Sequence, residues 1–111
     1  MSSKSWITQV RKGLLEMCIL NLLAKEELYG YDLVKKLGEL QDWDISGGTV
    51  YPILNRLKKE GSITSELRES DVGPVRKYYG LTPDGNEKLS EMNANWLQLN
   101  GMIKVLIGKN K

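Results

Sequence analysis

The sequence predicts a mostly helical α+β fold, and three observations carry that prediction. Apolar residues recur at helical spacing up to Gly61, the period changes from about 3.6 to about 2 between Ser62 and Leu81, and a helical pattern returns after Pro83. The resulting order is three helices, an antiparallel hairpin and a long final helix. We therefore expect a winged helix-turn-helix domain with a long C-terminal helix.

The composition limits the classes of protein that the chain can belong to. It has 111 residues, a net charge of +2 and no histidine. This length suffices for one domain with a buried core. The commonest general base and metal ligand is missing, and the single Cys18 has no imidazole partner, so we expect neither an enzyme nor a bound metal or cofactor. No apolar run reaches the length of a membrane span, and we expect a cytoplasmic protein.

The first helix is predicted from about Ser5 to Lys25. One apolar stripe runs along it, and a second apolar set makes its latter half apolar almost all round. The stripe consists of Ile7, Val10, Leu14, Met17 or Cys18, and Leu22, and the second set of Leu15, Ile19, Leu20 and Leu23. A helix that is apolar on every side is normally buried on every side, so we expect a second molecule to cover part of it.

Residues 26–31 are predicted to form a turn before a second helix, which ends near Gln41 to Asp44. The apolar stripe of this helix consists of Leu33, Val34, Leu37 and Leu40. A loop that ends in residues 46–48 then leads to a third helix, in the manner of a helix-turn-helix.

The third predicted helix has two unlike faces. The apolar stripe consists of Val50, Ile53, Leu54 and Leu57, and the polar face of Tyr51, Asn55, Arg56, Lys58 and Lys59. Ser46 or Thr49 is the N-cap, with Pro52 in the first turn if Thr49 is the cap, and Gly61 ends the helix. A face with a tyrosine, a carboxamide and cations suits the major groove of DNA, whereas a solvated face that contacts nothing is the alternative.

A hairpin is predicted directly after this helix, with strands over residues 62–67 and 75–81. The turn-rich connection, residues 69–74, is not expected to continue a strand because of its glycine and proline. Arg76 and Lys77 lie early in the returning strand. They either contact phosphate or form a charged, solubilising strand edge.

The last helix starts with the cap Thr82, followed by Pro83 and Asp84, and is predicted to run to about Ile107. Its apolar residues have the spacing of a narrow coiled-coil seam: Leu89, Met92, Trp96, Leu99, Ile103 and Leu106. The simplest partner for this seam is the same helix of a second copy. Packing on the first helix of the same chain is the alternative.

Three runs of the sequence closely resemble motifs of the PadR family of bacterial transcriptional regulators. They are residues 29–33, 48–61 and 76–85, and the resemblance covers almost the whole chain. The single C-terminal helix is similar to that of the small subfamily. The resemblance implies a homodimeric repressor in which residues 1–82 are the winged helix DNA-binding domain. Residues 83–111 would be the C-terminal dimerisation helix, forming one compact unit with the N-terminal helix.

The resemblance also implies which residues bind. The third helix would enter the major groove of a near-palindromic operator, with the wing along the backbone. DNA would then be contacted by Ser46, Thr49, Tyr51, Pro52, Asn55, Arg56, Lys58, Arg76 and Lys77. Some small members bind planar, apolar effectors at the dimer interface, which implies a ligand site of Met17, Asn21, Trp96 and Asn100. Glu16 places a charge near this surface, and paired Trp96 side chains that only fill the dimer core are the alternative.

Two other functions fit the same pattern. A winged helix can dock a protein instead of DNA, and the low net charge is compatible with such a protein-interaction module. The other is a ligand or multidrug sensor with little DNA affinity. A steep fall of DNA affinity with salt would identify a DNA-binding regulator, because it reports phosphate contacts.

Overall fold

Four helices and one three-stranded sheet make up residues 3–40, 44–70 and 73–109, which are the residues that this computed structural model describes. The elements are α1 (Ser3–Lys25), β1 (Leu28–Tyr29), α2 (Gly30–Glu39), α3 (Gly47–Lys59), β2 (Ile63–Ser70), β3 (Gly73–Leu81) and α4 (Pro83–Lys109). The predicted mostly helical α+β fold, a winged helix with a long final helix, is confirmed.

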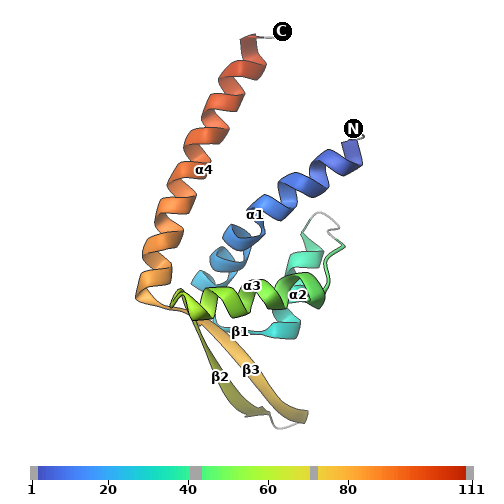
Figure 1. The fold of residues 1–111 in the computed structure, drawn as a ribbon, viewed down its shortest axis with the longest axis vertical. Helices are drawn as coiled ribbons and strands as arrows, with labels where there is room; N and C mark the ends of the chain where they lie inside the picture. Colours follow the sequence, from blue (N-terminus) through green and yellow to red (C-terminus); the bar gives the residue numbers. More distant parts are fainter. Residues whose placement is uncertain (1–2, 41–43, 71–72, 110–111) are drawn as a thin grey trace.

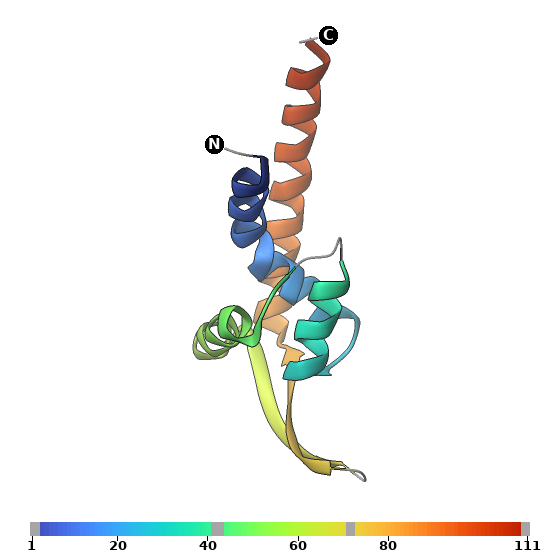
Figure 2. The same cartoon turned by 90° about the vertical axis from the view of Figure 1, so that its right-hand side faces the viewer.

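The molecule is elongated, with extents of 57 × 31 × 21 Å. The far half of α4 and the start of α1 project from one end, and the β2–β3 hairpin projects from the other (Figure 1). Helix α3 crosses between them, next to the base of the hairpin (Figure 1), and Figure 2 shows it almost end-on at one side of the molecule. The latter half of α1 holds these parts together, because it packs among the other elements.

The core is built around that half of α1. Its buried side chains come from every element: Leu15, Ile19, Leu20, Leu23, Leu28, Leu33, Leu37, Val50, Leu54, Leu57, Ile63, Tyr79 and Leu89. The chain itself therefore covers the second apolar set of α1, where we expected a second molecule to contribute. The predicted stripe with Leu14, Met17 and Leu22 is instead half-buried at the edge of the core. Periodicity found both sets, but only packing decides which of them lies inside.

Strand β1 was not predicted. Residues 26–31 were expected to form only a turn, but Leu28 and Tyr29 pair with Tyr79 and Tyr78 of β3 in antiparallel register, which gives the strand order β1-β3-β2. A two-residue strand has too few residues to show an alternating pattern. Helix α2 ends at Glu39, earlier than predicted, and residues 41–43 of the predicted end lie outside the described residues.

The hairpin is longer than predicted. Strand β2 continues to Ser70 and β3 starts at Gly73, so the expectation that residues 69–74 do not continue a strand is wrong for residues 69–70 and 73–74, and residues 71–72 lie outside the described residues. Pro74 is tolerated because β1 pairs with β3 only at its base, which leaves β3 with one unpaired edge near Pro74. Leu67 is 67% exposed because this part of the hairpin extends past the helices (Figure 1).

The ends of α3 differ in how well the sequence predicts them. The helix starts at Gly47, so Thr49 is not its cap, and the Ser46 side chain at the cap position makes no capping bond. Pro52 therefore lies inside the helix and not in its first turn, and the helix lacks the amide hydrogen bond that this residue would otherwise make. At the other end Gly61, with φ of 82°, stops the helix as predicted.

Thr82 is the predicted cap of α4. Its Oγ1 accepts a hydrogen bond from the Gly85 amide at 2.9 Å and donates to the carbonyl oxygen of Gly61 at 2.6 Å. The cap thus joins the start of α4 to the end of α3 and the start of β2.

Candidate nucleic-acid interface

Helix α3 turns one face into the core and the opposite face to solvent. Val50, Leu54 and Leu57 are fully buried, and on a helix the residues opposite this stripe are Pro52, Asn55 and Lys59. The α3 residues and cap predicted to contact DNA are all exposed: Ser46, Thr49, Tyr51, Pro52, Asn55, Arg56 and Lys58. Lys59 was left out of that prediction although the same helical periodicity places it at the centre of the exposed face.

Arg56 lies on one flank of α3, where it belongs to a closed ring of four charges. Its Nη1 donates to Glu16 Oε1 of α1 at 3.0 Å and to Glu60 Oε1 at 2.9 Å. Lys88 Nζ of α4 donates to the same two carboxylates, at 3.2 Å to Glu16 and 3.1 Å to Glu60. The ring connects α1, α3 and α4, and it shows that Glu16 points toward α3.

The ring changes the acidity of its members. Hydrogen bonds from Lys88 and then from Arg56 lower the pKa of Glu60, and hydrogen bonds to Glu60 and then Glu16 raise the pKa of Arg56. The Arg56 side chain is still 49% exposed, so water screens these pairs and each contributes little energy. Both ion pairs use Nη1, so other N–H groups of this guanidinium could bind a phosphate, in competition with the two carboxylates for its charge.

Tyr51 lies on the other flank of α3, against the start of α2. A Cβ atom added to Gly30 or to Gly47 would lie 2.6 Å from a carbon of the Tyr51 ring. The ring therefore sits between two glycines and is 40% exposed. Its charge also contributes to the raised pKa of Tyr79, after the larger effect of burial, which places the two phenols near each other.

The wing carries a cluster of tyrosines and arginines. The Arg76 guanidinium lies 4.5 Å from the centre of the Tyr29 ring, and Arg68 lies 4.8 Å from that of Tyr78. The Tyr29 and Tyr78 rings are 5.7 Å apart, and Arg68 also donates to Glu27 at 2.7 Å. Such stacking holds a guanidinium in place while leaving its edge free to donate.

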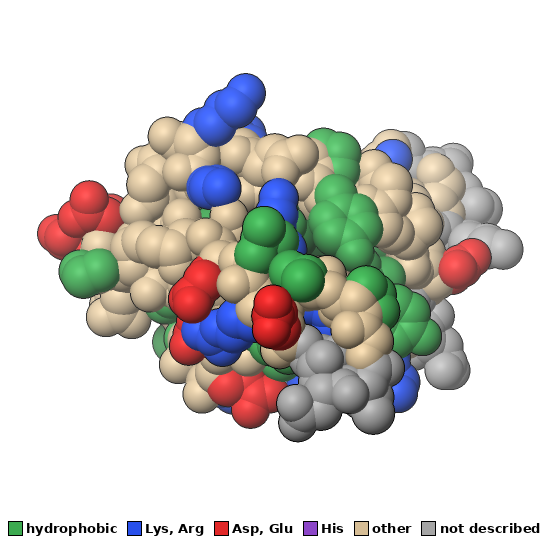
Figure 3. All heavy atoms as spheres, turned by 90° about the horizontal axis from the view of Figure 1, so that it is seen from below, with side chains coloured by type: hydrophobic (Ala, Val, Ile, Leu, Met, Phe, Trp, Pro, Cys, Tyr) green, Lys and Arg blue, Asp and Glu red, His purple; other side chains and the backbone are tan. Residues whose placement is uncertain are grey.

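An open hollow of about 250 Å³ lies between the start of α3 and the wing. It is lined by Tyr29, Gly30, Tyr31, Tyr51, Arg76, Lys77 and Tyr79. Three residues predicted to contact DNA, Tyr51 of α3 and Arg76 and Lys77 of β3, thus meet at one place although they come from two separate elements. Seen from the hairpin end, hydrophobic side chains lie at the centre of the molecule with basic and acidic side chains beside them (Figure 3).

The four predicted ligand residues follow the contact between α1 and α4. Met17, Asn21, Trp96 and Asn100 are all half-buried. The Asn21 side chain exchanges two hydrogen bonds of 3.0 Å with Asn93, which the sequence prediction left out. Asn93 lies one turn before Trp96 on α4. Its hydrogen-bond partner Asn21 is on α1, so the pair could be identified only from the packing of the two helices.

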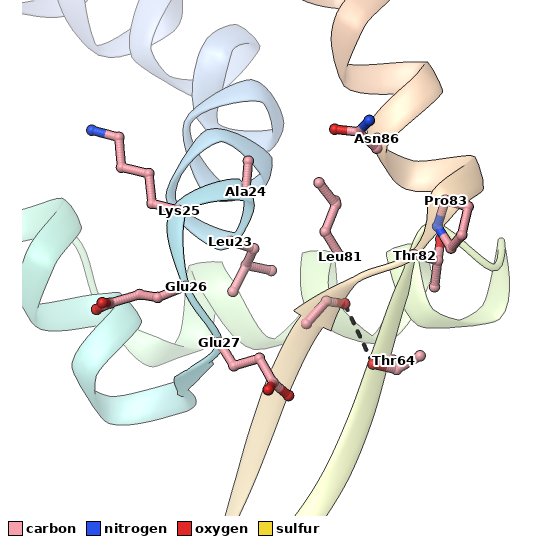
Figure 4. A pocket seen from close by; sticks show the side chains of 11 residues that line it. Leu23, Ala24, Lys25, Glu26, Glu27, Thr64, Leu81, Thr82, Pro83 and Asn86 are labelled. Carbon is pink, nitrogen blue, oxygen red and sulfur yellow. Dashed lines mark hydrogen bonds between the residues drawn. The ribbon is translucent and has the colours of Figure 1, made fainter.

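A second open hollow, of about 520 Å³, lies where α1, the sheet and α4 meet (Figure 4). Leu23, Leu81 and Pro83 line it together with the polar side chains of Thr64 and Asn86. None of the predicted ligand residues lines this hollow.

The predicted dimer seam changes character along α4. Leu89 is buried and Met92 and Trp96 are half-buried, but Leu99, Ile103 and Leu106 are exposed. Other apolar residues of the far half are exposed as well, so that this half is apolar on more sides than the seam: Leu97, Met102, Val105 and Ile107.

No helix in the described part of the chain is long and apolar enough to cross a membrane. Among the same residues, no acidic or cysteine side chains gather into a group that could hold a metal ion.

Comparisons with known proteins agree with this geometry. Residues 19–91 match the model of the "Transcriptional regulator PadR-like family". The chain is 34% identical to the transcriptional regulator Rv3488 of Mycobacterium tuberculosis over 83 residues, which are 75% of this chain and 76% of that protein.

Two solved structures are similar to the whole fold or to part of it. A PadR-like transcriptional regulator from Bacillus cereus has a TM-score of 0.82 and 40% identity, covering 89% of this chain and 96% of that one. Bacillus subtilis PadR in complex with operator DNA has a TM-score of 0.64 and 34% identity, covering 71% of this chain and 46% of that one. This chain belongs to the PadR-like family of transcriptional regulators.

Proposed function

We propose that this protein is a homodimeric, cytoplasmic repressor that binds operator DNA, and that a small planar, apolar ligand alters its operator affinity. The observation that carries the proposal is the meeting of Tyr51 with Arg76 and Lys77 at one hollow beside the exposed face of α3. Cations for phosphates and polar side chains for base edges are then available on one surface. Bacillus subtilis PadR, which has a similar fold, forms a complex with operator DNA.

In this proposal residues 1–82 bind DNA and residues 83–111 dimerise. The DNA contacts are those named from the sequence, with Lys59 added and with Arg56 sharing its charge with Glu16 and Glu60. The seam from Leu89 to Leu106 forms the dimer, which is supported by seven apolar side chains of the far half of α4 that are 43–67% exposed in the single chain.

The ligand site is proposed along α1 and α4, around Trp96. Its support is a half-buried indole beside the polar Asn21–Asn93 pair, since a mostly apolar site with few polar groups is typical of small-molecule pockets. A dimer core filled by paired Trp96 side chains would give the same exposure in the single chain.

The first test is fluorescence anisotropy with labelled DNA from immediately upstream of the protein's own gene, at low and high salt and with unrelated competitor DNA. We expect tight binding that falls steeply with salt and survives the competitor. Binding that does not depend on salt, or no binding to that DNA, would contradict autoregulation and favour protein docking.

The dimer is tested separately by light scattering of the full chain and of Ile103→Glu. A charge at an apolar seam should shift the protein to monomer while its circular dichroism keeps the signal of the folded winged domain. Lys104→Glu, one residue along the same helix, is the matched control and should remain dimeric. A variant Ile103→Glu that stays dimeric would exclude this seam.

A further inference from the structure

Tyr51 reaches the hollow only because two glycines leave room for its ring. Gly30 begins α2 and Gly47 begins α3, and the ring lies between them. An added Cβ on Gly30 would lie 2.6 Å from Cε1 and 2.8 Å from the hydroxyl oxygen, and one on Gly47 would lie 2.6 Å from Cε2. Real Cβ atoms do not approach other atoms this closely, so any larger residue at either position must displace the ring.

The ring is confined at both of its edges, so the direction left to it is outward, into the open hollow. Gly30 faces one edge carbon and the hydroxyl, and Gly47 faces the opposite edge, so a push from one side presses the ring onto the other. Tyr79 of β3 lines the same hollow. The position of the Tyr51 hydroxyl at the hollow therefore depends on the space that the two glycines leave for the ring.

We propose that Gly30 and Gly47 are positioning residues for DNA binding, which hold the Tyr51 phenol at the hollow so that its hydroxyl acts with Arg76 and Lys77 on one phosphate of the DNA backbone. Neither glycine contacts DNA in this arrangement. The inference rests on the proposed function, and it adds Gly30, an α2 residue outside the contact set derived from the sequence.

The choice of a phosphate follows from the groups that line the hollow. Arg76 and Lys77 supply positive charge, and the Tyr51 hydroxyl supplies a further donor. Arg76 is stacked on Tyr29 at 4.5 Å, so two of the groups are held in place before DNA arrives. Preorganised donors lose less side-chain freedom on binding than flexible ones.

The test is a double-mutant cycle of Gly30→Ala and Tyr51→Ala, measured both as urea unfolding without DNA and as anisotropy with the labelled upstream DNA. Gly30→Ala should weaken DNA binding by about tenfold or more, because the added methyl displaces the ring. In the Tyr51→Ala background the same change should have no effect on binding or on stability, because the ring that it meets is gone. Gly13→Ala, where an added Cβ meets no atom within 4 Å, is the matched control and should bind as the wild type does.

Tyr51→Phe separates the hydroxyl from the packing of the ring. It should leave the unfolding transition unchanged and still weaken binding, with the same salt dependence as wild type, because the hydroxyl is a neutral donor and the cations remain. Binding by Tyr51→Phe that equals wild type would overturn the phosphate role, and equal binding by Gly30→Ala would overturn the positioning role.

Two further outcomes keep the inference separate from the proposed function. If Gly30→Ala alone does not fold, the double variant should fold, and its failure to do so would show that the methyl meets something other than Tyr51. A wild-type protein that does not bind the DNA would contradict the proposed function. The urea unfolding measurements of the double-mutant cycle would still test whether Gly30 leaves room for the Tyr51 ring.

Discussion

At its N-terminal end helix α3 is held by an aromatic ring between two glycines, whereas at its C-terminal end it is held by a ring of four charges. The first contact is steric and joins α3 to α2 through Tyr51 and Gly30. The second is electrostatic and joins α3 to α1 and α4 through Arg56, Glu16 and Lys88. Steric contacts do not respond to ionic strength, but exposed ion pairs do.

The difference matters because the two ends connect α3 to different parts of the molecule. The N-terminal end faces the wing and the hollow, and the C-terminal end faces the helices that carry the proposed dimer and ligand surfaces. A change in how α1 and α4 pack would reach α3 first through the charged ring. A sterically held end beside the proposed DNA surface and a charge-held end beside the proposed effector site would suit a regulator whose binding is adjustable.

The largest expected loss of stability comes from a bulkier residue in the steric contact at the N-terminal end of α3. Gly30→Val should lower the free energy of unfolding by about 3 kcal/mol, because its side chain overlaps the Tyr51 ring and forces it out from between the two glycines. Urea unfolding at low and high salt should give the same loss. Gly48→Ala, where an added Cβ has only an ordinary contact of 3.5 Å with Ser46, is the control in the neighbouring helix.

Removing the ring itself should cost somewhat less. Tyr51→Ala uncovers part of the core and leaves a gap between α2 and α3, for a loss of about 2 kcal/mol in the free energy of unfolding. The loss should again not depend on salt. A destabilisation that disappears in high salt would mean that the N-terminal end is held by charge after all.

Breaking ion pairs of the charged ring should lower the free energy of unfolding by a smaller amount. High salt should remove this loss. Arg56→Ala leaves Glu16 and Glu60 with Lys88 as their shared cation, and we expect a loss of about 1 kcal/mol at low salt. High salt should reduce this loss toward zero, and Lys59→Ala, an exposed cation of the same helix, should have no comparable effect. An equal loss at both salt concentrations would contradict the electrostatic account.

The smallest expected effect is a dependence on pH. The folded state lowers the pKa of Glu60 below its ordinary value of 4.5, so its contribution to stability is present above that pH and is lost as the pH falls through the lower folded pKa. Glu60→Gln should therefore make thermal stability less dependent on pH in this acidic range. An unchanged pH profile would show that Glu60 titrates normally.

Sequence periodicity predicted the helices and the hairpin because each is long enough to repeat its pattern. It also placed Val50, Leu54 and Leu57 inside and Asn55 outside, which the burial confirms. It missed β1, which is two residues long, and left the start of α3 open between Ser46 and Thr49, of which Ser46 occupies the cap position. Short pairings and exact helix ends depend on partners in other elements, and no local pattern contains them.

The sequence by itself determined the order of the elements, the family and the exposed face of α3, because each of these depends on neighbouring residues along the chain. Only the tertiary structure decided what the flanks of that helix do. Tyr51 and Arg56 both lie beside the apolar stripe, so the helical pattern does not distinguish their roles. Gly30 leaves room for the Tyr51 ring, and Glu16 forms an ion pair with Arg56. Both partners are distant from α3 in the sequence and lie beside it only in the folded protein.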